Sequence, residues 1–392
     1  MINLTTLYGG SSASDGLRYG SSMHGRSADA ASASQRRPVV VWTMSRRCNL
    51  HCVHCYSDSS DQQFPGELSV GESRRMLGDL ARFGIPALLL SGGEPLLHPH
   101  FFELAEFARA QGLRLTLSTN GTLMTAQTAR RIKGLGFTYV GISFDGLGKT
   151  HDQFRGRRGA FEAALAGVRN LKAVGQRVGL RFTLTRRNVE ALPEIAALVE
   201  QEQIDRVCFY HLVYSGRGGR LAAETLSHEE TRRVMNCLCL WAKAASAGSH
   251  PVEILTVDNH VDGVYVYLKL LAEDPLEAEL VRRRLAWNGG GANASGVGIA
   301  NIDARGNVHP DQFWQEAMLG NVRERPFSEI WTDATQPLLA ALRDRLPKLT
   351  GRCAQCRWAS LCGGSFRVRA LQATGDPWAP DPACYLTDEE IT

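Results

Sequence analysis

The stretch of sequence that decides the fold reads Arg47-Cys48-Asn49-Leu50-His51-Cys52-Val53-His54-Cys55-Tyr56. Its three cysteines, Cys48, Cys52 and Cys55, follow the pattern C-x3-C-x2-C. A [4Fe–4S] cluster contains four irons, and each iron takes a thiolate or another ligand. Three closely spaced cysteines therefore bind three irons and leave the fourth open to a substrate or cofactor. This pattern predicts a cluster that takes part in chemistry.

A zinc site is the main alternative for these cysteines. Zinc generally takes four ligands, and His51 or His54 could supply the fourth. Burial of three ordinary cysteines is a second alternative. The segments that follow in the chain favour the cluster over both.

The composition limits the classes of protein to which the chain can belong. At 392 residues it can form one large domain and a smaller one. The 44 basic and 40 acidic residues nearly cancel, which is no signature of a nucleic-acid partner. No apolar run of about 18 residues predicts a membrane span, and no secretory signal pattern is present. Ten cysteines in uneven clusters favour metal ligation over disulfides, so we expect a cytoplasmic enzyme.

Strand-like and helical patterns alternate through the first two thirds of the chain. The strand-like runs are residues 38–43, 87–90, 114–118, 139–143, 179–185 and 207–212, and the helical stretches are residues 70–83, 101–111, 125–135, 160–174 and 192–202. Strict alternation predicts a parallel sheet. Six strands are fewer than the eight of a closed barrel. We therefore predict an α/β fold, a partial (β/α)6 TIM-like barrel with its active site at the C-terminal strand ends.

The remaining segments complete the predicted domain organisation. Residues 1–36 are rich in Ser, Ala and Gly without a sustained hydrophobic period, so we expect a mostly disordered leader. The partial barrel is assigned to residues 37–240 and a helical bridging segment to residues 241–286. A glycine-rich stretch at residues 288–293 then marks a boundary. Residues 287–392 form a smaller domain with a second group of cysteines.

Polar segments follow three of the predicted strands. Ser91-Gly92-Gly93-Glu94-Pro95 offers glycines that allow close approach of a ligand and a carboxylate that can accept from an ammonium group. Ser118-Thr119-Asn120-Gly121 and Ser143-Phe144-Asp145-Gly146 end the next two strands. Arg155, shortly afterwards, could pair with a carboxylate bidentately. Taken singly, these segments could be ordinary turns and Arg155 a surface residue.

In this order and at these strand ends, the segments resemble the radical S-adenosylmethionine (SAM) superfamily. The resemblance implies that the amine and carboxylate of SAM bind the open iron, and that one electron splits the sulfonium to give a 5′-deoxyadenosyl radical. It makes Cys48, Cys52 and Cys55 the catalytic cluster ligands. The SAM-binding residues implied by the resemblance are Tyr56, Gly92, Gly93, Glu94, Ser118, Asn120, Ser143 and Arg155.

The second cysteine group has the spacing C-x2-C-x5-C-x21-C. Its members are Cys353, Cys356, Cys362 and Cys384. By spacing alone, four thiolates suit a structural zinc and a fully ligated [4Fe–4S] cluster equally well. The segment resembles the SPASM/twitch extension of radical SAM enzymes, which implies an auxiliary [4Fe–4S] cluster. We therefore expect two clusters in total.

The chain departs from the full SPASM pattern at two positions. A further cysteine normally lies five residues after a glycine, where this chain has Asp311 after Gly306. Another would follow Cys362 by four residues, where this chain has Phe366. The ligands of one auxiliary cluster are therefore missing, and we expect Asp311 to be a solvated turn carboxylate. The cysteines expected to ligate nothing are Cys208, Cys237 and Cys239.

Over residues 38–390 the chain resembles the radical SAM enzymes of haem d1 biosynthesis, most specifically in its C-terminal part. This resemblance implies a tetrapyrrole substrate, 12,18-didecarboxysirohaem, and removal of two propionate side chains on the way to the oxo groups of haem d1. A propionate C–H is unactivated, so a primary alkyl radical can abstract its hydrogen where no protein base could. The reaction requires a low-potential electron donor such as flavodoxin or ferredoxin.

A substrate with several carboxylates should meet arginines, and its iron could meet a histidine. A surface or structural role is the favoured interpretation for each of the candidates, which are Arg217, Arg220, Arg357, Arg367, Arg369, His260 and His309. Three alternative functions remain. The chain could act on a related tetrapyrrole by acetate removal or propionate decarboxylation, it could be a SPASM-type enzyme that modifies a peptide, or it could be a redox carrier or zinc-stabilised binding protein.

Overall fold

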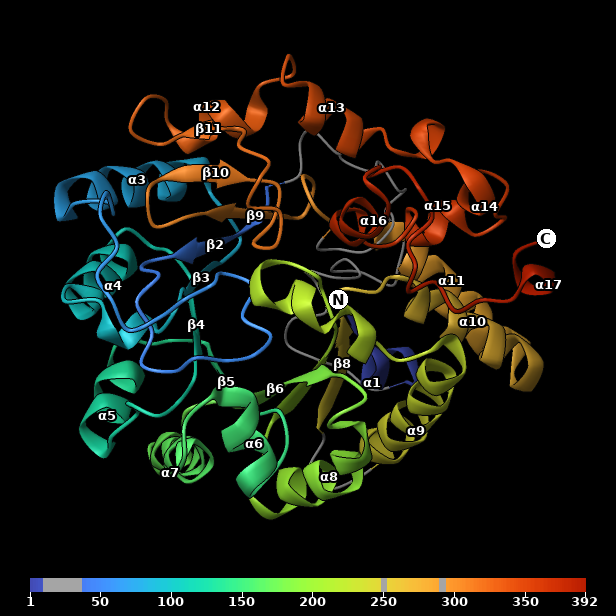
Figure 1. The fold of residues 1–392 in the computed structure, drawn as a ribbon, viewed down its shortest axis with the longest axis horizontal. Helices are drawn as coiled ribbons and strands as arrows, with labels where there is room; N and C mark the ends of the chain where they lie inside the picture. Colours follow the sequence, from blue (N-terminus) through green and yellow to red (C-terminus); the bar gives the residue numbers. More distant parts are fainter. Residues whose placement is uncertain (10–36, 248–251, 289–293) are drawn as a thin grey trace.

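A computed structural model describes residues 1–9, 37–247, 252–288 and 294–392. Its centre is a curved sheet whose main strands run parallel (Figure 1). These strands are β2 (Val39–Thr43), β3 (Leu88–Ser91), β4 (Leu115–Thr119), β5 (Tyr139–Ser143), β6 (Val178–Leu184), β7 (Arg206–His211) and β8 (Glu253–Val257). Each of the seven contains buried apolar residues, as expected for a parallel sheet that is covered on both faces.

The sheet extends beyond the six predicted strands at both edges. Its full order is β1-β8-β7-β6-β5-β4-β3-β2-β9-β10-β11, and it does not close into a barrel. Strand β9 (Ile299–Ile302) pairs in parallel with β2, and β10 (Asn307–His309) and β11 (Gly320–Asn321) follow antiparallel. The α/β fold class with an open parallel sheet is therefore confirmed, and the C-terminal part shares the sheet of the barrel.

Helices cover the outer face of the sheet (Figure 1). They are α3 (Val70–Phe83), α4 (Phe101–Ala110), α5 (Ala126–Gly134), α6 (Gly148–Arg155), α7 (Ala160–Ala173), α8 (Leu192–Gln201) and α9 (His228–Ala247). Helix α3 illustrates the local signals: Ser69 and Glu72 form a capping box at its start, and Gly84 ends it with φ +75°. Short 3-10 turns lie between elements at η1 (Pro95–Leu97), η2 (Val189–Ala191), η3 (Gly216–Glu224) and η4 (Leu346–Lys348).

The N-terminal residues correct the prediction of a disordered leader over residues 1–36. Strand β1 (Ile2–Asn3) pairs antiparallel with β8, and α1 (Leu4–Leu7) packs against β8 and α9. Ile2, Leu4 and Leu7 are fully buried. The apolar side chains of this short segment are stabilised by a strand far along the sequence, which no local period indicates. Residues 10–36 lie outside the described residues.

The segment at residues 241–286 is also not wholly helical, because it contains β8. Glu253, at the start of this strand, is buried and forms ion pairs with Arg177 and Arg206. After β8 follow α10 (Val261–Glu273) and α11 (Pro275–Asn288). Most of the glycine-rich boundary, residues 289–293, lies outside the described residues. Within the described ranges no helix is long and apolar enough to cross a membrane.

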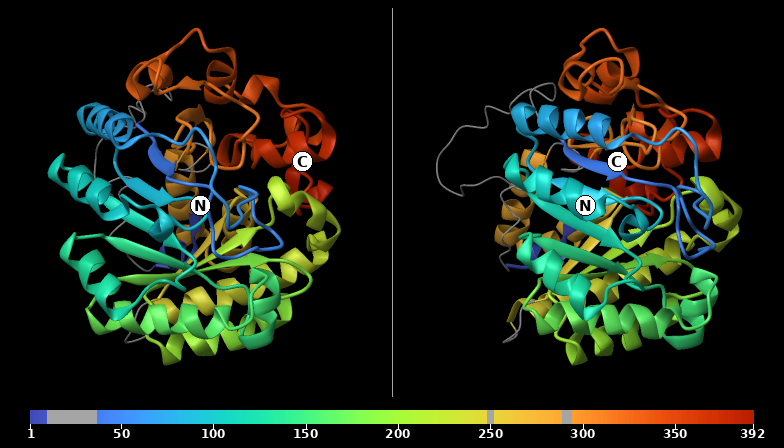
Figure 2. Two further views of the ribbon diagram at one scale, coloured as in Figure 1. Left: turned by 60° about the vertical axis from the view of Figure 1, so that its left-hand side comes forward. Right: turned by 90° about the vertical axis from the view of Figure 1, so that its left-hand side faces the viewer.

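The C-terminal segment, residues 294–392, contains β9, β10 and β11 and then a series of short helices beside the open side of the sheet (Figure 2). They are α12 (Phe327–Thr332), α13 (Pro337–Arg343), α14 (Gly351–Ala354), α15 (Ala359–Cys362), α16 (Arg367–Thr374) and α17 (Asp388–Ile391). Within this segment, Arg369 and Asp381 form a fully buried ion pair. The Arg369 guanidinium also donates to the carbonyl oxygens of Leu212 and Asp258, which directly follow β7 and β8.

Candidate active site and cluster sites

The loop after β2 carries the three cysteines that the sequence singles out. Cys48 and Cys52 are buried and Cys55 is partly buried. The backbone N–H of Leu50 donates to Cys48 Sγ (3.4 Å), and that of Ser59 donates to Cys55 Sγ (3.4 Å). Burial raises the pKa of the Cys48 thiol to about 12, so ligation of a metal there must displace a proton. N–H groups directed at sulfur stabilise metal-bound thiolates, which fits a cluster at this loop.

An arginine from the region after β5 lies beside Cys52. Arg155, the last residue of α6, donates from Nη1 to Cys52 Sγ (3.6 Å) and pairs with the buried carboxylate of Asp145. Nε2 of His54 lies 3.4 Å from Asp145 Oδ2. Burial opposes ionisation of Asp145, but Arg155, His54 and the backbone N–H of Thr183 together outweigh it and keep the Asp145 pKa below its ordinary value. The guanidinium therefore offsets negative charge at Cys52, while its predicted contact with SAM stays a prediction.

Arg217, a candidate for contact with substrate, holds the cysteine loop and also lines the cavity beside it. Its Nε donates to the carbonyl oxygen of Cys52 (2.8 Å), and its Nη1 donates to Ser59 O (3.0 Å) and Asp58 Oδ1 (2.9 Å). Gly216 allows this close approach, because a Cβ there would lie 2.6 Å from the carbonyl oxygen of Cys55. The loop after β7 thereby fixes the position of the loop after β2.

Two glycines after β3 bring a second backbone segment against the cysteine loop. The N–H of Gly93 donates to Ser45 O (2.8 Å). A Cβ at Gly93 would lie 2.3 Å from Arg47 O, and one at Gly92, where φ is +148°, would lie 2.5 Å from Ser45 O. These contacts are far shorter than a carbon and an oxygen tolerate, so only glycine fits at either position.

Glu94 differs from the other predicted SAM contacts because it does not line the cavity beside the cysteine loop. Its buried carboxylate accepts from Thr119 Oγ1 (2.8 Å), Asn120 N–H (2.8 Å) and Leu96 N–H (3.1 Å). Burial raises the pKa of Glu94 to about 7 despite these donors. In this structure Glu94 joins the ends of β3 and β4.

A cavity of about 260 Å³ opens at the C-terminal ends of the parallel strands. The predicted site residues that line it are Cys48, Cys52, Cys55, Tyr56, Gly92, Gly93, Ser118, Asn120, Ser143 and Arg155. Nδ2 of Asn120 lies 3.8 Å from Cys48 Sγ and donates to Asn49 Oδ1 (2.8 Å). The structure thus gathers residues from four successive strand ends around one space.

Several cavity residues were not found by sequence reasoning. Arg181 on β6 lines the cavity, and its Nη1 donates to Ser118 Oγ (2.6 Å). Thr183, His211 and Asp258 line it as well. A charged residue at an alternate position of an apolar strand is a signal that could have identified Arg181. Asp258 could not be found this way, because the strand before it was not predicted.

The C-terminal segment completes the cavity where the SPASM pattern lacks its cysteines. Asp311 and Phe366 both line it, together with Phe313. Asp311 is only 1 % exposed, which corrects the expectation of a solvated carboxylate. It accepts from the N–H groups of Phe313 (2.7 Å) and Trp314 (3.0 Å) and from Ser295 Oγ, so protein donors replace water. The rings of Phe313 and Phe366 meet edge to face at 5.7 Å.

The second cysteine group surrounds a separate small cavity of about 20 Å³. Its lining includes Cys353, Cys356, Cys362 and Cys384. Trp358 N–H donates to Cys356 Sγ (3.4 Å) and Arg352 Nη1 to Cys384 Sγ (3.5 Å). Nowhere in the described residues do three or more His, Cys, Asp or Glu side chains converge as around a single ion. A cubane differs here because each thiolate binds a different iron, so its cysteines enclose a wider space.

The other candidates have structural contacts. Arg367 is buried and donates to the carbonyl oxygens of Pro377 and Ala379. Arg220 and Arg357 are exposed, and neither lines the cavity. His309 Nδ1 donates to the carbonyl oxygen of Ala317 (2.9 Å) outside the cavity, whereas His260 lines the cavity. The unassigned cysteines are dispersed: Cys208 is buried on β7, Cys239 is buried on α9, and Cys237 is exposed.

Comparison with protein families gives two matches. Residues 42–199 match the radical SAM superfamily, and residues 296–357 match the SPASM iron-sulfur cluster-binding domain. The first match covers the cysteine loop and the strand ends β2 to β6, and the second begins just before β9 and ends after Cys353 and Cys356.

Curated relatives are similar over nearly the whole chain. The pre-heme d1 synthase of Dinoroseobacter shibae is 51% identical over 357 residues, covering 90% of this chain and 87% of that protein. The Fe-coproporphyrin III synthase of Methanosarcina barkeri is 48% identical over 396 residues, covering 100% of this chain and 99% of that protein. An AdoMet-dependent heme synthase of the same organism is 30% identical over 88% of this chain and 95% of its own length.

Solved structures with the same fold include two enzymes with bound SAM. Streptococcus suis SuiB bound to S-adenosylmethionine gives a TM-score of 0.67 at 18% identity, covering 90% of this chain and 78% of that one. Native anSMEcpe with bound AdoMet and a peptide also gives 0.67 at 18% identity, covering 89% and 94%. At this identity the likeness concerns the fold.

Proposed function

Because this chain belongs to the radical SAM superfamily and carries a SPASM iron–sulfur domain, we propose that it removes two propionate side chains from 12,18-didecarboxysirohaem during haem d1 synthesis. The chain is a radical SAM enzyme related to enzymes of haem synthesis. One structural observation carries the proposal: a single cavity joins the three-cysteine loop to residues of the C-terminal segment. The 51% identity to a pre-heme d1 synthase supports the choice of reaction.

We assign Cys48, Cys52 and Cys55 to a [4Fe–4S] cluster that binds SAM. Cys353, Cys356, Cys362 and Cys384 are assigned to one auxiliary [4Fe–4S] cluster. Support for both assignments comes from the N–H groups directed at their sulfurs, and for the first also from Arg155 beside Cys52. The total is two clusters, because Asp311 and Phe366 occupy the positions of the further cysteines.

The first cluster with SAM, when bound, would supply a 5′-deoxyadenosyl radical that can abstract hydrogen from an unactivated C–H. The residues of the chain bind and orient SAM and the substrate, and they exclude water from the cavity. Gly92 and Gly93 expose backbone for SAM, and Arg155 offsets the charge of the thiolates. Tyr56, whose ring meets Phe313 at 5.0 Å, extends an apolar wall with Phe366 that suits a flat macrocycle.

A second candidate function is acetate removal from a related tetrapyrrole. It is favoured by the extent of one match, since the Fe-coproporphyrin III synthase aligns with this chain along its full length. The two functions differ only in which side chain faces the radical. Both need an electron donor of low potential, for which we propose a flavodoxin or ferredoxin, and a compartment that keeps thiols reduced, for which we propose the cytoplasm.

The deciding experiment is an anaerobic assay of the reconstituted enzyme with SAM, a low-potential reductant and 12,18-didecarboxysirohaem, followed by product mass. Loss of propionate carbons with formation of 5′-deoxyadenosine is the expected result. Loss of acetate carbons would select the second candidate, and an unchanged tetrapyrrole would reject both. Cys48→Ala should abolish deoxyadenosine formation, whereas Cys237→Ala, which removes an exposed thiol on α9, should not change it.

A further inference from the structure

Asp258 directly follows β8 and has an unusual backbone conformation. Its φ is +65°, in the left-handed region that Asp and Asn enter more readily than other residues with side chains. Asp258 is buried and lines the cavity. It follows β8, whereas the cysteine loop follows β2, at the other end of the row of parallel strands from β8 to β2. Such conformations persist only where the surrounding structure holds them, and they are frequent at binding sites.

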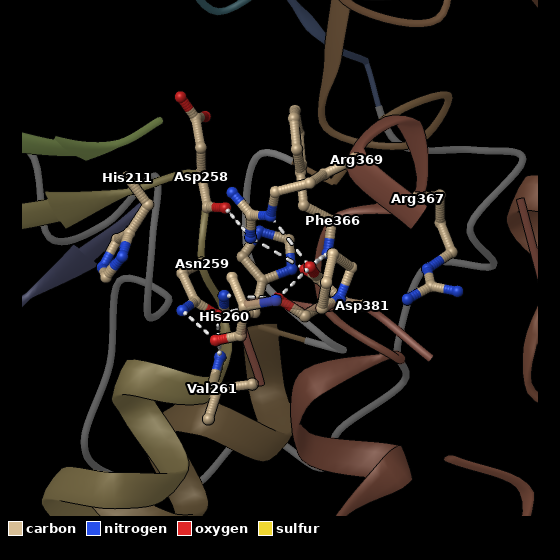
Figure 3. A network of polar contacts seen from close by, with 12 residues as sticks. His211, Asp258, Asn259, His260, Val261, Phe366, Arg367, Arg369 and Asp381 are labelled. Atoms are coloured by element: carbon tan, nitrogen blue, oxygen red, sulfur yellow. Dashed lines mark hydrogen bonds and ion pairs between the residues drawn. The ribbon is translucent and has the colours of Figure 1, made fainter. Parts of the chain in front are cut away.

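A buried network holds the backbone of Asp258 in this conformation (Figure 3). Nη2 of Arg369 donates to the Asp258 carbonyl oxygen (2.8 Å) and to Asp381 Oδ2 (2.8 Å). The next residue, Asn259, accepts from Ser365 Oγ (2.9 Å) and donates to Ala383 O (3.0 Å). These hydrogen bonds fix the main chain of Asp258, and none of them involves its carboxyl group.

The carboxyl group of Asp258 stands apart from this network (Figure 3). Its Oδ2 atom is buried and has no hydrogen-bond partner among the described residues. Asp311, in the same cavity, has three donors for its carboxylate. A buried polar atom without a partner is costly, so the cavity favours a ligand group that can hydrogen-bond to Asp258.

The titratable groups that act on Asp258 come from several elements of the fold. They belong to Arg369, His211, Asp311, Tyr210, Tyr56 and the amino group of Met1. Burial dominates over the cationic groups and raises the pKa of Asp258 to about 7. Below that pH the group is a neutral acid, which donates a hydrogen bond as well as accepting one.

We propose that Asp258 binds a carboxylate side chain of the substrate, through one proton held between the two carboxyl groups. This assignment rests on the proposed function, which makes the substrate a macrocycle with several carboxylates. Two carboxyl groups in contact ionise together only at great cost, so they share a proton. The resulting O–H···O⁻ hydrogen bond is of the strong, charge-assisted kind. Asp258 is thus a specificity-determining residue that accepts a carboxylate without an arginine.

The test is a binding titration of the anaerobically reconstituted enzyme with 12,18-didecarboxysirohaem at pH 6, 7 and 8. Absorption gives the Kd, and calorimetry in two buffers of different ionisation enthalpy gives the protons taken up. Because the complex needs a proton that free Asp258 loses above pH 7, the wild type should take up about one proton at pH 8. Its Kd should rise about tenfold per pH unit above 7 by the same linkage.

Asp258→Asn is the matched variant, because Asn also tolerates a positive φ and keeps a donor but cannot titrate. We expect its Kd to be constant with pH and its proton uptake to be about one lower at pH 8. Asp344→Asn, an exposed residue at the end of α13, should behave as wild type. Equal proton uptake by Asp258→Asn and wild type would overturn the assignment and leave the proposed function standing. Failure of the wild type to bind the tetrapyrrole would overturn both.

Discussion

At the scale of single residues, Gly93 determines how two loops fit together. Its Cα approaches the carbonyl oxygens of Arg46 and Arg47 so closely that an added Cβ would lie 2.7 and 2.3 Å from them. Both carbonyl groups belong to the main chain just before Cys48, so they cannot move aside as a flexible side chain could. Any larger residue at Gly93 must therefore displace the cysteine loop or the loop after β3.

Gly93→Ala should consequently reduce the rate of SAM cleavage by about 10²-fold, the loss expected for a displacement of about 1 Å in an active site. Formation of 5′-deoxyadenosine without tetrapyrrole measures this effect. Gly134→Ala, at the end of α5, is the control, because a Cβ there meets nothing within 4 Å. A Gly93→Ala enzyme with wild-type SAM cleavage would show that the cysteine loop tolerates the shift.

The predictability of the site residues depended on how locally their roles are encoded. The cysteine loop and the glycines after β3 line the cavity as the sequence predicts. Residues that are close in sequence directly after a strand must also lie close together in space. Glu94 was placed in the right loop, yet three protein donors hold its carboxylate behind the cavity. Asp311 was expected in solvent, because nothing in its own turn indicates the fold of the C-terminal segment over it.

At the scale of secondary-structure elements, the N-terminal pair β1 and α1 closes one edge of the sheet. Leu4 and Leu7 are 0 % exposed and belong to the same apolar core as the barrel helices. Thr5 adds a polar link, since its Oγ1 donates to Val252 O (3.0 Å) and accepts from Ile254 N–H (3.0 Å). Strand β1 and helix α1 are therefore part of the folded core and contribute to its stability.

Leu4→Ala should lower the free energy of unfolding by about 2–5 kcal/mol, as for other buried leucines. Leu276→Ala is its control, because Leu276 on α11 is 83 % exposed and the same substitution should change stability by no more than about 0.5 kcal/mol. Chemical denaturation of the two variants measures both values. Equal stability of the two variants would mean that β1 and α1 do not pack in solution as described.

Loss of the auxiliary cluster proposed at the second cysteine group should not abolish SAM cleavage. Cys353→Ala removes one ligand of the proposed auxiliary cluster and leaves the cavity beside Cys48 intact. We expect the iron content to fall by about half, because one of two similar clusters is lost. Measurable 5′-deoxyadenosine formation should remain. Full iron retention would count against an auxiliary cluster at this position.

The elements found by sequence analysis were those with a strong local period. Helix α3 was predicted with the bounds it has, because its apolar spacing, capping box and terminal glycine agree. Strand β8 was missed within a segment assigned as helical. It begins with Glu253, whose charge is stabilised by Arg177 and Arg206 from distant parts of the chain. That compensation is tertiary, so no window of sequence contains it.

At the scale of the whole molecule, the barrel and the C-terminal segment form one connected structure. Strand β9 continues the sheet from β2, with Val41 opposite Asn301. On the other side, Arg369 of α16, which pairs with Asp381, donates to the carbonyl oxygens of Leu212 and Asp258 after β7 and β8. The cavity is therefore shaped by both parts, and its geometry depends on their connection.

Arg369→Ala should lower the free energy of unfolding by about 3–5 kcal/mol, because it leaves the buried carboxylate of Asp381 without its partner. Denaturation of the reconstituted enzyme measures the loss. Arg357→Ala, which removes an exposed arginine of the same segment, should change stability by about 0.5 kcal/mol or less. Similar stability of the two variants would show that the buried Asp381 carboxylate does not depend on Arg369.

The pairing of β1 with β8 also determines when the sheet can be finished during synthesis. Ile2 lies opposite Thr256, so β1 leaves the ribosome before its partner strand, which is made some 250 residues later. At ordinary elongation rates of about 5–20 residues per second, this partner emerges roughly 13 to 50 s afterwards. Throughout that interval Ile2, Leu4 and Leu7 are apolar residues without their native neighbours. The nascent chain therefore carries a segment that a chaperone can recognise, and β1 and α1 are among the last of these elements to reach their native contacts.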